Sequence, residues 1–165
     1  MKKLKNVCAI DDYQTKCLES SVDTVNRYLS THYQYQIDWS SPIKSHCATY
    51  GLSQPLDNKN SSTEFHEVCH KDHDSTCEFC DLLPQIFVAI KNVLKKSVNQ
   101  NQISEEDMDS FEYDLDICEE NIYAYKYHVI RAFAQNHTWE KDIQRGLTDT
   151  VYITQDWVQF VHLCY

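Results

Sequence analysis

Apolar side chains recur three and four residues apart, without a break, from residue 108 to residue 132. Such a heptad pattern predicts one long helix, of the kind found in coiled coils and helical bundles. Ser104, followed three residues later by Asp107, predicts a capped start for this helix. The positions of the pattern are Met108, Phe111, Leu115, Cys118, Ile122, Tyr125, Val129 and Ala132.

The first half of this helix carries much of the acidity of the chain. The 165 residues include 25 acidic and 15 basic side chains, for a formal charge of −10. Nine of the acids lie between Ser104 and Glu120, which leaves 16 acidic against 15 basic residues elsewhere. We interpret the acidic run as the solvated face of a helix, and the alternative is a surface for a basic partner.

Two further helices are predicted from the same kind of spacing. One covers residues 11–33, and the other runs from Asp81, as its cap, to about Ser97, with Pro84 in its first turn. The β-branched and aromatic residues 150–154 predict a short strand near the C-terminus. The expected fold is therefore mainly α, with three long helices and a short C-terminal β-strand.

Metal-binding chemistry is concentrated in the sequence CHKDHDSTCEFC of residues 69–80. It contains the set Cys69-x3-His73-x3-Cys77-x2-Cys80, in which three thiolates and one imidazole suit a tetrahedral Zn²⁺ ion. Four protein ligands leave no position for a reactive water, so the predicted zinc site is structural.

Other residues compete for places in this site. His70 is a rival for the imidazole position, and His46 and Cys47 could contribute from a distance, Cys47 in place of a histidine. Unrelated buried cysteines and surface histidines are the alternative to a metal site. Residues 40–81 contain few large apolar side chains, so zinc would supply their folding energy, on the order of 10 kcal/mol.

The N-terminus gives no sign of export. The start MKKLKNVCAIDDYQ has no apolar core of a signal peptide, and no apolar run approaches the ~18 residues of a membrane span. We expect an intracellular protein, nuclear or cytoplasmic, whose eight cysteines stay reduced.

Four motifs occur in an order that resembles a known group of proteins. They are His46-Cys-Ala-Thr-Tyr-Gly-Leu-Ser-Gln-Pro, Cys77-x-x-Cys80-x-x-Leu83, Tyr125-Lys-Tyr-His128-Val-Ile-Arg131 and Val151-Tyr-Ile-Thr-Gln-Asp156-Trp157. The chain thereby resembles the N-terminal part of uncharacterised, transposon-associated proteins of invertebrates and fungi. In that group a Cys/His zinc cluster precedes a DDE-type, RNase H-like transposase core.

The resemblance implies two regions and no catalysis by the chain as given. Residues 1–145 would form a helical zinc-binding region, and residues 146–165 a truncated start of the RNase H-like core. Asp156 resembles the first metal-binding acid of that core, but two-metal chemistry needs partner carboxylates that do not follow it. We therefore expect no enzyme, but the remnant of a transposase that lacks most of its catalytic core.

Two functions follow as expectations. The first is a zinc-stabilised scaffold or interaction region, with a second copy or another protein bound along the heptad helix. The alternative is a DNA-binding module that recognises transposon ends. Acidic residues around the Cys/His cluster disfavour phosphate binding there, and no membrane partner is expected.

Overall fold

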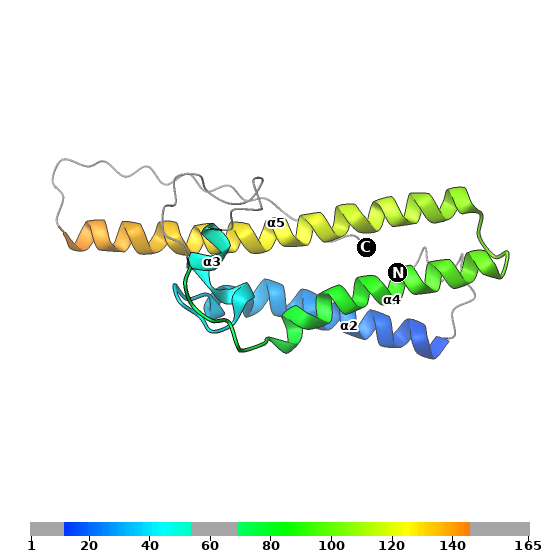
Figure 1. Cartoon of the computed structure of the whole chain (residues 1–165), viewed down its shortest axis with the longest axis horizontal. Helices are drawn as coiled ribbons and strands as arrows, with labels where there is room; N and C mark the ends of the chain where they lie inside the picture. The colour runs from blue at the N-terminus through cyan, green and yellow to red at the C-terminus, as the bar shows by residue number, and fades with distance from the viewer. Residues whose placement is uncertain (1–11, 54–68, 146–165) are drawn as a thin grey trace.

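The computed structural model describes residues 12–53 and 69–145 (Figure 1). The described elements are α2 (Asp12–Thr31), the 3-10 helices η1 (Tyr33–Gln36) and η2 (Lys44–His46), α3 (Ala48–Leu52), α4 (Glu78–Asn99) and α5 (Glu105–Gln144). The prediction of a mainly helical protein with three long helices is confirmed.

Within the described ranges the backbone forms isolated β-bridges but no strand. The predicted strand at residues 150–154, the region 146–165 and Asp156 all lie outside the described residues. None of the described helices is long and apolar enough to cross a membrane.

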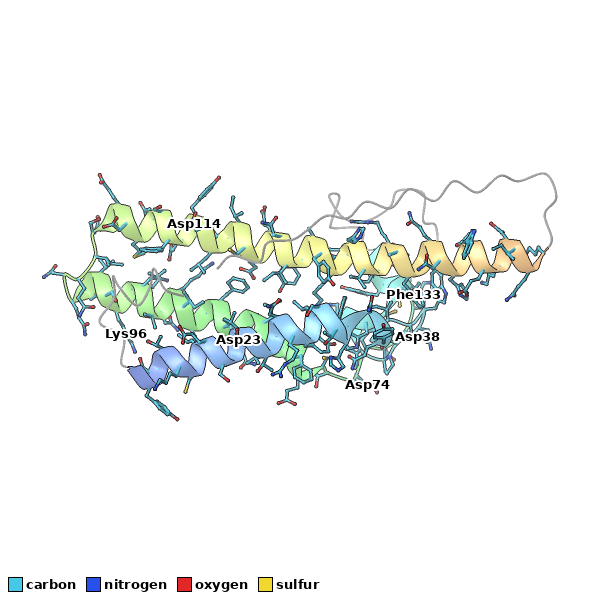
Figure 2. All side chains as sticks on the ribbon, turned by 180° about the vertical axis from the view of Figure 1, so that it is seen from behind. Asp23, Asp38, Asp74, Lys96, Asp114 and Phe133 are labelled. Carbon is cyan, nitrogen blue, oxygen red and sulfur yellow. The ribbon has the colours of Figure 1, made fainter. Side chains whose placement is uncertain are left out.

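The three long helices lie side by side, with α5 running along the other two and continuing past them (Figure 1). Buried apolar residues of α2 and α4 form most of the core, and the apolar face of α5 covers them. Side chains fill the space between α5 and the other two long helices (Figure 2). The core residues of the long helices are Val25, Tyr28, Leu29, Leu83, Ile86, Phe87, Ile90, Leu94 and Ile130.

Helix α4 begins earlier than the sequence predicts. Its N-cap is Cys77, whose carbonyl accepts the Asp81 amide at 2.9 Å, so Asp81 lies inside the first turn instead of capping it. Pro84 lies within the helix, beyond the first turn. Because proline has no N–H, it cannot donate the helical hydrogen bond to the carbonyl of Cys80 four residues earlier.

The turn between α4 and α5 is a Schellman motif without glycine. Asn101 has a φ of 55°, and its amide donates to the Val98 carbonyl at 2.8 Å. The Gln102 amide donates to the Ser97 carbonyl at 2.9 Å, which completes the motif. Asparagine tolerates this left-handed conformation better than most residues do, so it takes the place that glycine usually fills.

Helix α5 begins at the predicted cap. The Ser104 hydroxyl accepts the Asp107 amide at 3.1 Å and donates to the Asp107 carboxylate at 2.7 Å. The carboxylate thus bonds to the serine side chain, whereas a capping box would direct it to the amide of the cap residue.

The apolar face of α5 packs inside the molecule. The first seven heptad positions, from Met108 to Val129, contact the core, but Ala132 does not continue the series. Beyond Tyr125 the face in contact widens from Val129 to Lys126, Ile130 and Phe133, each one residue after a heptad position. A straight α-helix has 3.6 residues per turn and drifts about 20° per heptad away from a 3.5-residue repeat, which explains the shift.

The predicted solvated face of α5 also carries an acidic residue that forms an ion pair with α4. Lys91 of α4 donates to the Asp116 carboxylate at 2.8 Å, and both side chains remain accessible to solvent. An exposed pair of this kind is screened by solvent, so it adds little to the apolar packing.

Candidate metal centres

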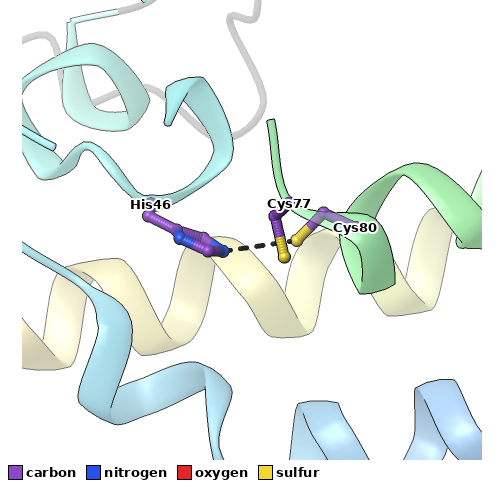
Figure 3. A group of neighbouring side chains, drawn as sticks. All are labelled: His46, Cys77 and Cys80. Atoms are coloured by element: carbon purple, nitrogen blue, oxygen red, sulfur yellow. Dashed lines mark hydrogen bonds between the residues drawn. The ribbon is translucent and has the colours of Figure 1, made fainter. Parts of the chain in front are cut away.

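Three ligand-type side chains meet where η2 approaches the start of α4 (Figure 3). His46 is the last residue of η2, Cys77 is the N-cap of α4, and Cys80 lies in the first turn of α4. The distance from Cys80 Sγ to His46 Nε2 is 3.5 Å, and all three ligand atoms lie within 4.8 Å of one another. We call this group the His46 centre.

Backbone contacts explain why these distant segments converge. Ile43 and Ser75 form a parallel β-bridge, in which the Ser75 amide donates to the Pro42 carbonyl at 3.3 Å. The hydroxyl of the buried Tyr33 donates to the Ser45 carbonyl at 2.8 Å and thereby fixes η2 against η1. The loop before α4 is therefore held beside η2, at the distance that brings His46 to the CxxC motif.

A second group forms around Cys47, the residue that follows His46. Its sulfur lies 3.8 Å from Cys69 Sγ, and Cys69 Sγ lies 3.7 Å from His73 Nε2. These three ligand atoms also lie within 4.8 Å of one another, and we call this group the Cys47 centre. Cys47 is the N-cap of α3, and its sulfur accepts the Tyr50 amide at 3.4 Å.

Aromatic packing holds the loop and the imidazole of the Cys47 centre. The ring of Tyr50 meets the His73 ring edge-on at 5.1 Å between centroids. Trp39, whose carbonyl accepts the Cys47 thiol at 3.4 Å, packs against Phe133 and His137 of α5, at 5.7 and 5.4 Å between ring centroids. Phe133 lies on the part of α5 that faces the loop of Asp38 (Figure 2).

The structure divides the four zinc ligands that the sequence suggests. Cys77 and Cys80 join His46, whereas Cys69 and His73 join Cys47. Both distant alternates, His46 and Cys47, therefore belong to the candidate centres. The third alternate, His70, is exposed and belongs to neither group.

In comparisons with known proteins, no family model, curated protein or solved structure matches this chain. What the two groups can do therefore follows from their own chemistry. Each has soft sulfur donors and one imidazole at the spacing of ligands around a single ion, a donor set that suits Zn²⁺.

Burial affects the ligand groups in two opposite ways. It lowers the pKa of His46, which favours the neutral imidazole that a metal ion binds. It is also the main cause that raises the pKa of the Cys47 thiol, which favours the protonated sulfur in the absence of a cation. A bound metal ion would reverse this second preference, because its charge stabilises the thiolate.

Two side chains beside the His46 centre have no obvious signal in the sequence. Lys126 of α5 is only 8% exposed, and its ammonium donates to Cys80 Sγ at 3.5 Å. Tyr28 of α2 is 3% exposed, and its hydroxyl lies near all three ligand atoms. In the sequence Tyr28 is one more residue of an apolar helix face, and Lys126 is one residue after a heptad position.

Proposed function

We propose that this protein is a zinc-stabilised helical scaffold in which two Cys/His centres fasten the loops to the bundle. The observation that supports the proposal most is the convergence of ligand atoms from η2, the α3 N-cap, the loop of residues 69–73 and the start of α4. Residues far apart in the chain are thereby grouped at metal-binding distances at two neighbouring places.

The elements around the centres are too short to be stable alone. Helix α3 has five residues, and η1 and η2 have four and three. Isolated helices need roughly 12–15 residues even for marginal stability in water. Metal binding can supply the missing free energy, on the order of 10 kcal/mol for small zinc modules.

Metal removal tests the proposal by a contrast within one molecule. With a chelator, we expect faster amide hydrogen exchange in residues 37–53 and 69–80, because the metal ions no longer hold these segments. Residues 86–99 of α4 pack in the apolar core and should keep most of their protection. Exchange mass spectrometry measures both, and loops whose exchange is unchanged by the chelator would contradict the proposal.

We further propose that the scaffold is the N-terminal, non-catalytic part of a transposase-like protein. The support is the order of the four sequence motifs that end at Asp156 and Trp157. Reading the gene beyond the codon for Tyr165 tests this origin, since a related core would continue with strands and further acidic residues.

DNA binding remains the second candidate, with the sequence resemblance in its favour. Charge argues against it, because the exposed acids Asp72, Asp74, Glu78 and Asp81 lie close to the ligands in the sequence, and Lys126 is buried. Fluorescence anisotropy with duplex DNA at two salt concentrations tests it. Tight binding that weakens with salt would support the DNA module over a protein-interaction scaffold.

A further inference from the structure

The phenol oxygen of Tyr28 lies close to every ligand atom of the His46 centre. It is 2.9 Å from His46 Nε2, 3.4 Å from Cys77 Sγ and 3.9 Å from Cys80 Sγ. An oxygen near all three donors lies where a fourth ligand of one ion has to lie. These distances exceed zinc–ligand bond lengths, so the oxygen is at a vertex of the site and not at the place of the ion itself.

The distances agree with a tetrahedron around zinc. Bonds of about 2.0–2.3 Å give ligand–ligand edges of about 3.3 Å for N–O, about 3.5 Å for O–S and about 3.6 Å for N–S. The observed edges are 2.9 Å for the N–O pair, 3.4 and 3.9 Å for the two O–S pairs, and 3.5 Å for His46 with Cys80. Shifts of a few tenths of an ångström would make the edges regular.

We propose that Tyr28 is the fourth ligand of the His46 centre and binds the metal ion through its phenolate oxygen. This proposal rests on the proposed function, because it requires that the centre holds zinc. When the hydrated ion binds, it gives up its water ligands, and two thiols and one phenol each release a proton to solvent. Three bonds from sulfur or oxygen to zinc then form beside the bond from His46. The centre then has four protein ligands from three elements, α2, η2 and α4.

The charge of Lys126 supports an anionic fourth ligand. A zinc ion with two thiolates and an imidazole is neutral, and a phenolate makes the group −1. The ammonium of Lys126 lies 3.5 Å from Cys80 Sγ, with the rings of Tyr33 and Tyr123 at 5.2 and 6.0 Å, and it forms no ion pair with a carboxylate of the described residues. With Tyr28 bound as phenolate, this buried +1 charge is balanced, whereas a neutral water ligand leaves it unbalanced.

The surroundings of Tyr28 hold its ring in the required place. The ring stacks on that of Phe79, the third residue of the CxxC motif in the sequence. The ring centroids are 4.6 Å apart, and the ring planes differ by 18°. Its hydroxyl now donates to Gln36 Oε1 at 2.7 Å. A metal-bound phenolate has no proton to donate, so the Gln36 amide would turn to donate its NH₂ group instead.

The test is a zinc titration of the metal-depleted full-length chain, followed by proton release and near-ultraviolet absorption. In the wild type we expect the difference spectrum of ionised tyrosine at neutral pH, where free tyrosine is protonated. Tyr28→Phe should lose that spectrum, release one proton fewer and bind zinc at this centre at least 10-fold more weakly. Tyr125→Phe is the matched control, because it removes a phenol that donates to the Leu29 carbonyl and not to a ligand atom of the centre.

The outcomes separate this proposal from the scaffold function. If zinc binds the wild type without a tyrosinate spectrum, and Tyr28→Phe matches it in affinity and proton count, Tyr28 is not a ligand although the scaffold function stands. If the wild type takes up no zinc, both proposals fail. If Tyr28→Phe does not fold, the wild-type spectrum alone decides, with Tyr125→Phe showing that Tyr125 is not its source.

Discussion

At the scale of single residues, a buried lysine lies beside the His46 centre, with the rings of two tyrosines near its ammonium. A buried ammonium is costly unless a negative group lies beside it, and Cys80 is the group in contact with Lys126. In the proposed zinc-bound state, Lys126 would stabilise the anionic form of the centre from outside the ligand set. Such outer contacts typically change metal affinity by 10–100-fold when they are removed.

We expect Lys126→Met to weaken zinc binding at the His46 centre by about 10–100-fold, because it keeps the apolar stem and removes the charge. Competition with a chromogenic chelator measures the affinity. Lys91→Met is the control, since Lys91 pairs with Asp116 on the surface and should leave the affinity unchanged. Equal or tighter zinc binding by Lys126→Met would show that the centre carries no negative charge.

At the scale of elements, the packing of α3 on α5 depends on a glycine. A Cβ at position 51 would lie 2.9 Å from Ile130 Cδ1, closer than real Cβ contacts. Ile130 is buried, so its side chain has little room to move away. The small residue lets α3, which carries Cys47 at its N-cap, lie directly on the long helix.

Gly51→Ala should therefore lower the free energy of unfolding by about 1–3 kcal/mol, the usual cost of overpacking, despite the better helix propensity of alanine. Ile130→Val removes the clashing Cδ1 atom. The double variant should therefore lose less free energy of unfolding than the two single variants lose in sum. Urea denaturation of the four proteins measures this coupling. Strictly additive effects would mean that the two residues do not limit each other.

At the scale of the whole molecule, the helices were predictable because apolar spacing and caps are local signals. Ser104 caps α5 and the heptad positions up to Val129 pack as the sequence indicates. The expectation of eight reduced cysteines is wrong, however, because Cys118 is disulfide-bonded. The predicted start of α4 at Asp81 was wrong, because Cys77, whose spacing in the sequence indicates only a ligand, is also the N-cap of the helix. The shift of contacts from Ala132 to Phe133 follows the true helical period, which a strict heptad ignores.

The candidate centres were only half predictable. Local spacing placed Cys69, His73, Cys77 and Cys80 together in a single site, whereas the structure puts Cys77 and Cys80 in one group and Cys69 and His73 in another. It could not show that these pairs separate, because the bridge of Ile43 with Ser75 brings His46 to one pair while Cys47 joins the other. Tyr28 and Lys126 become visible only once α2 and α5 are packed around the site.

The number of zinc ions per chain tests the two-centre account most directly. Native mass spectrometry should find two zinc ions in the wild type and one each in Cys77→Ser and Cys47→Ser, because each variant disrupts a different centre. Cys17→Ser changes an exposed cysteine outside both groups and should keep two. The account would be contradicted by a wild type that holds one zinc ion, which both variants lose. A folded wild type without zinc would contradict it as well.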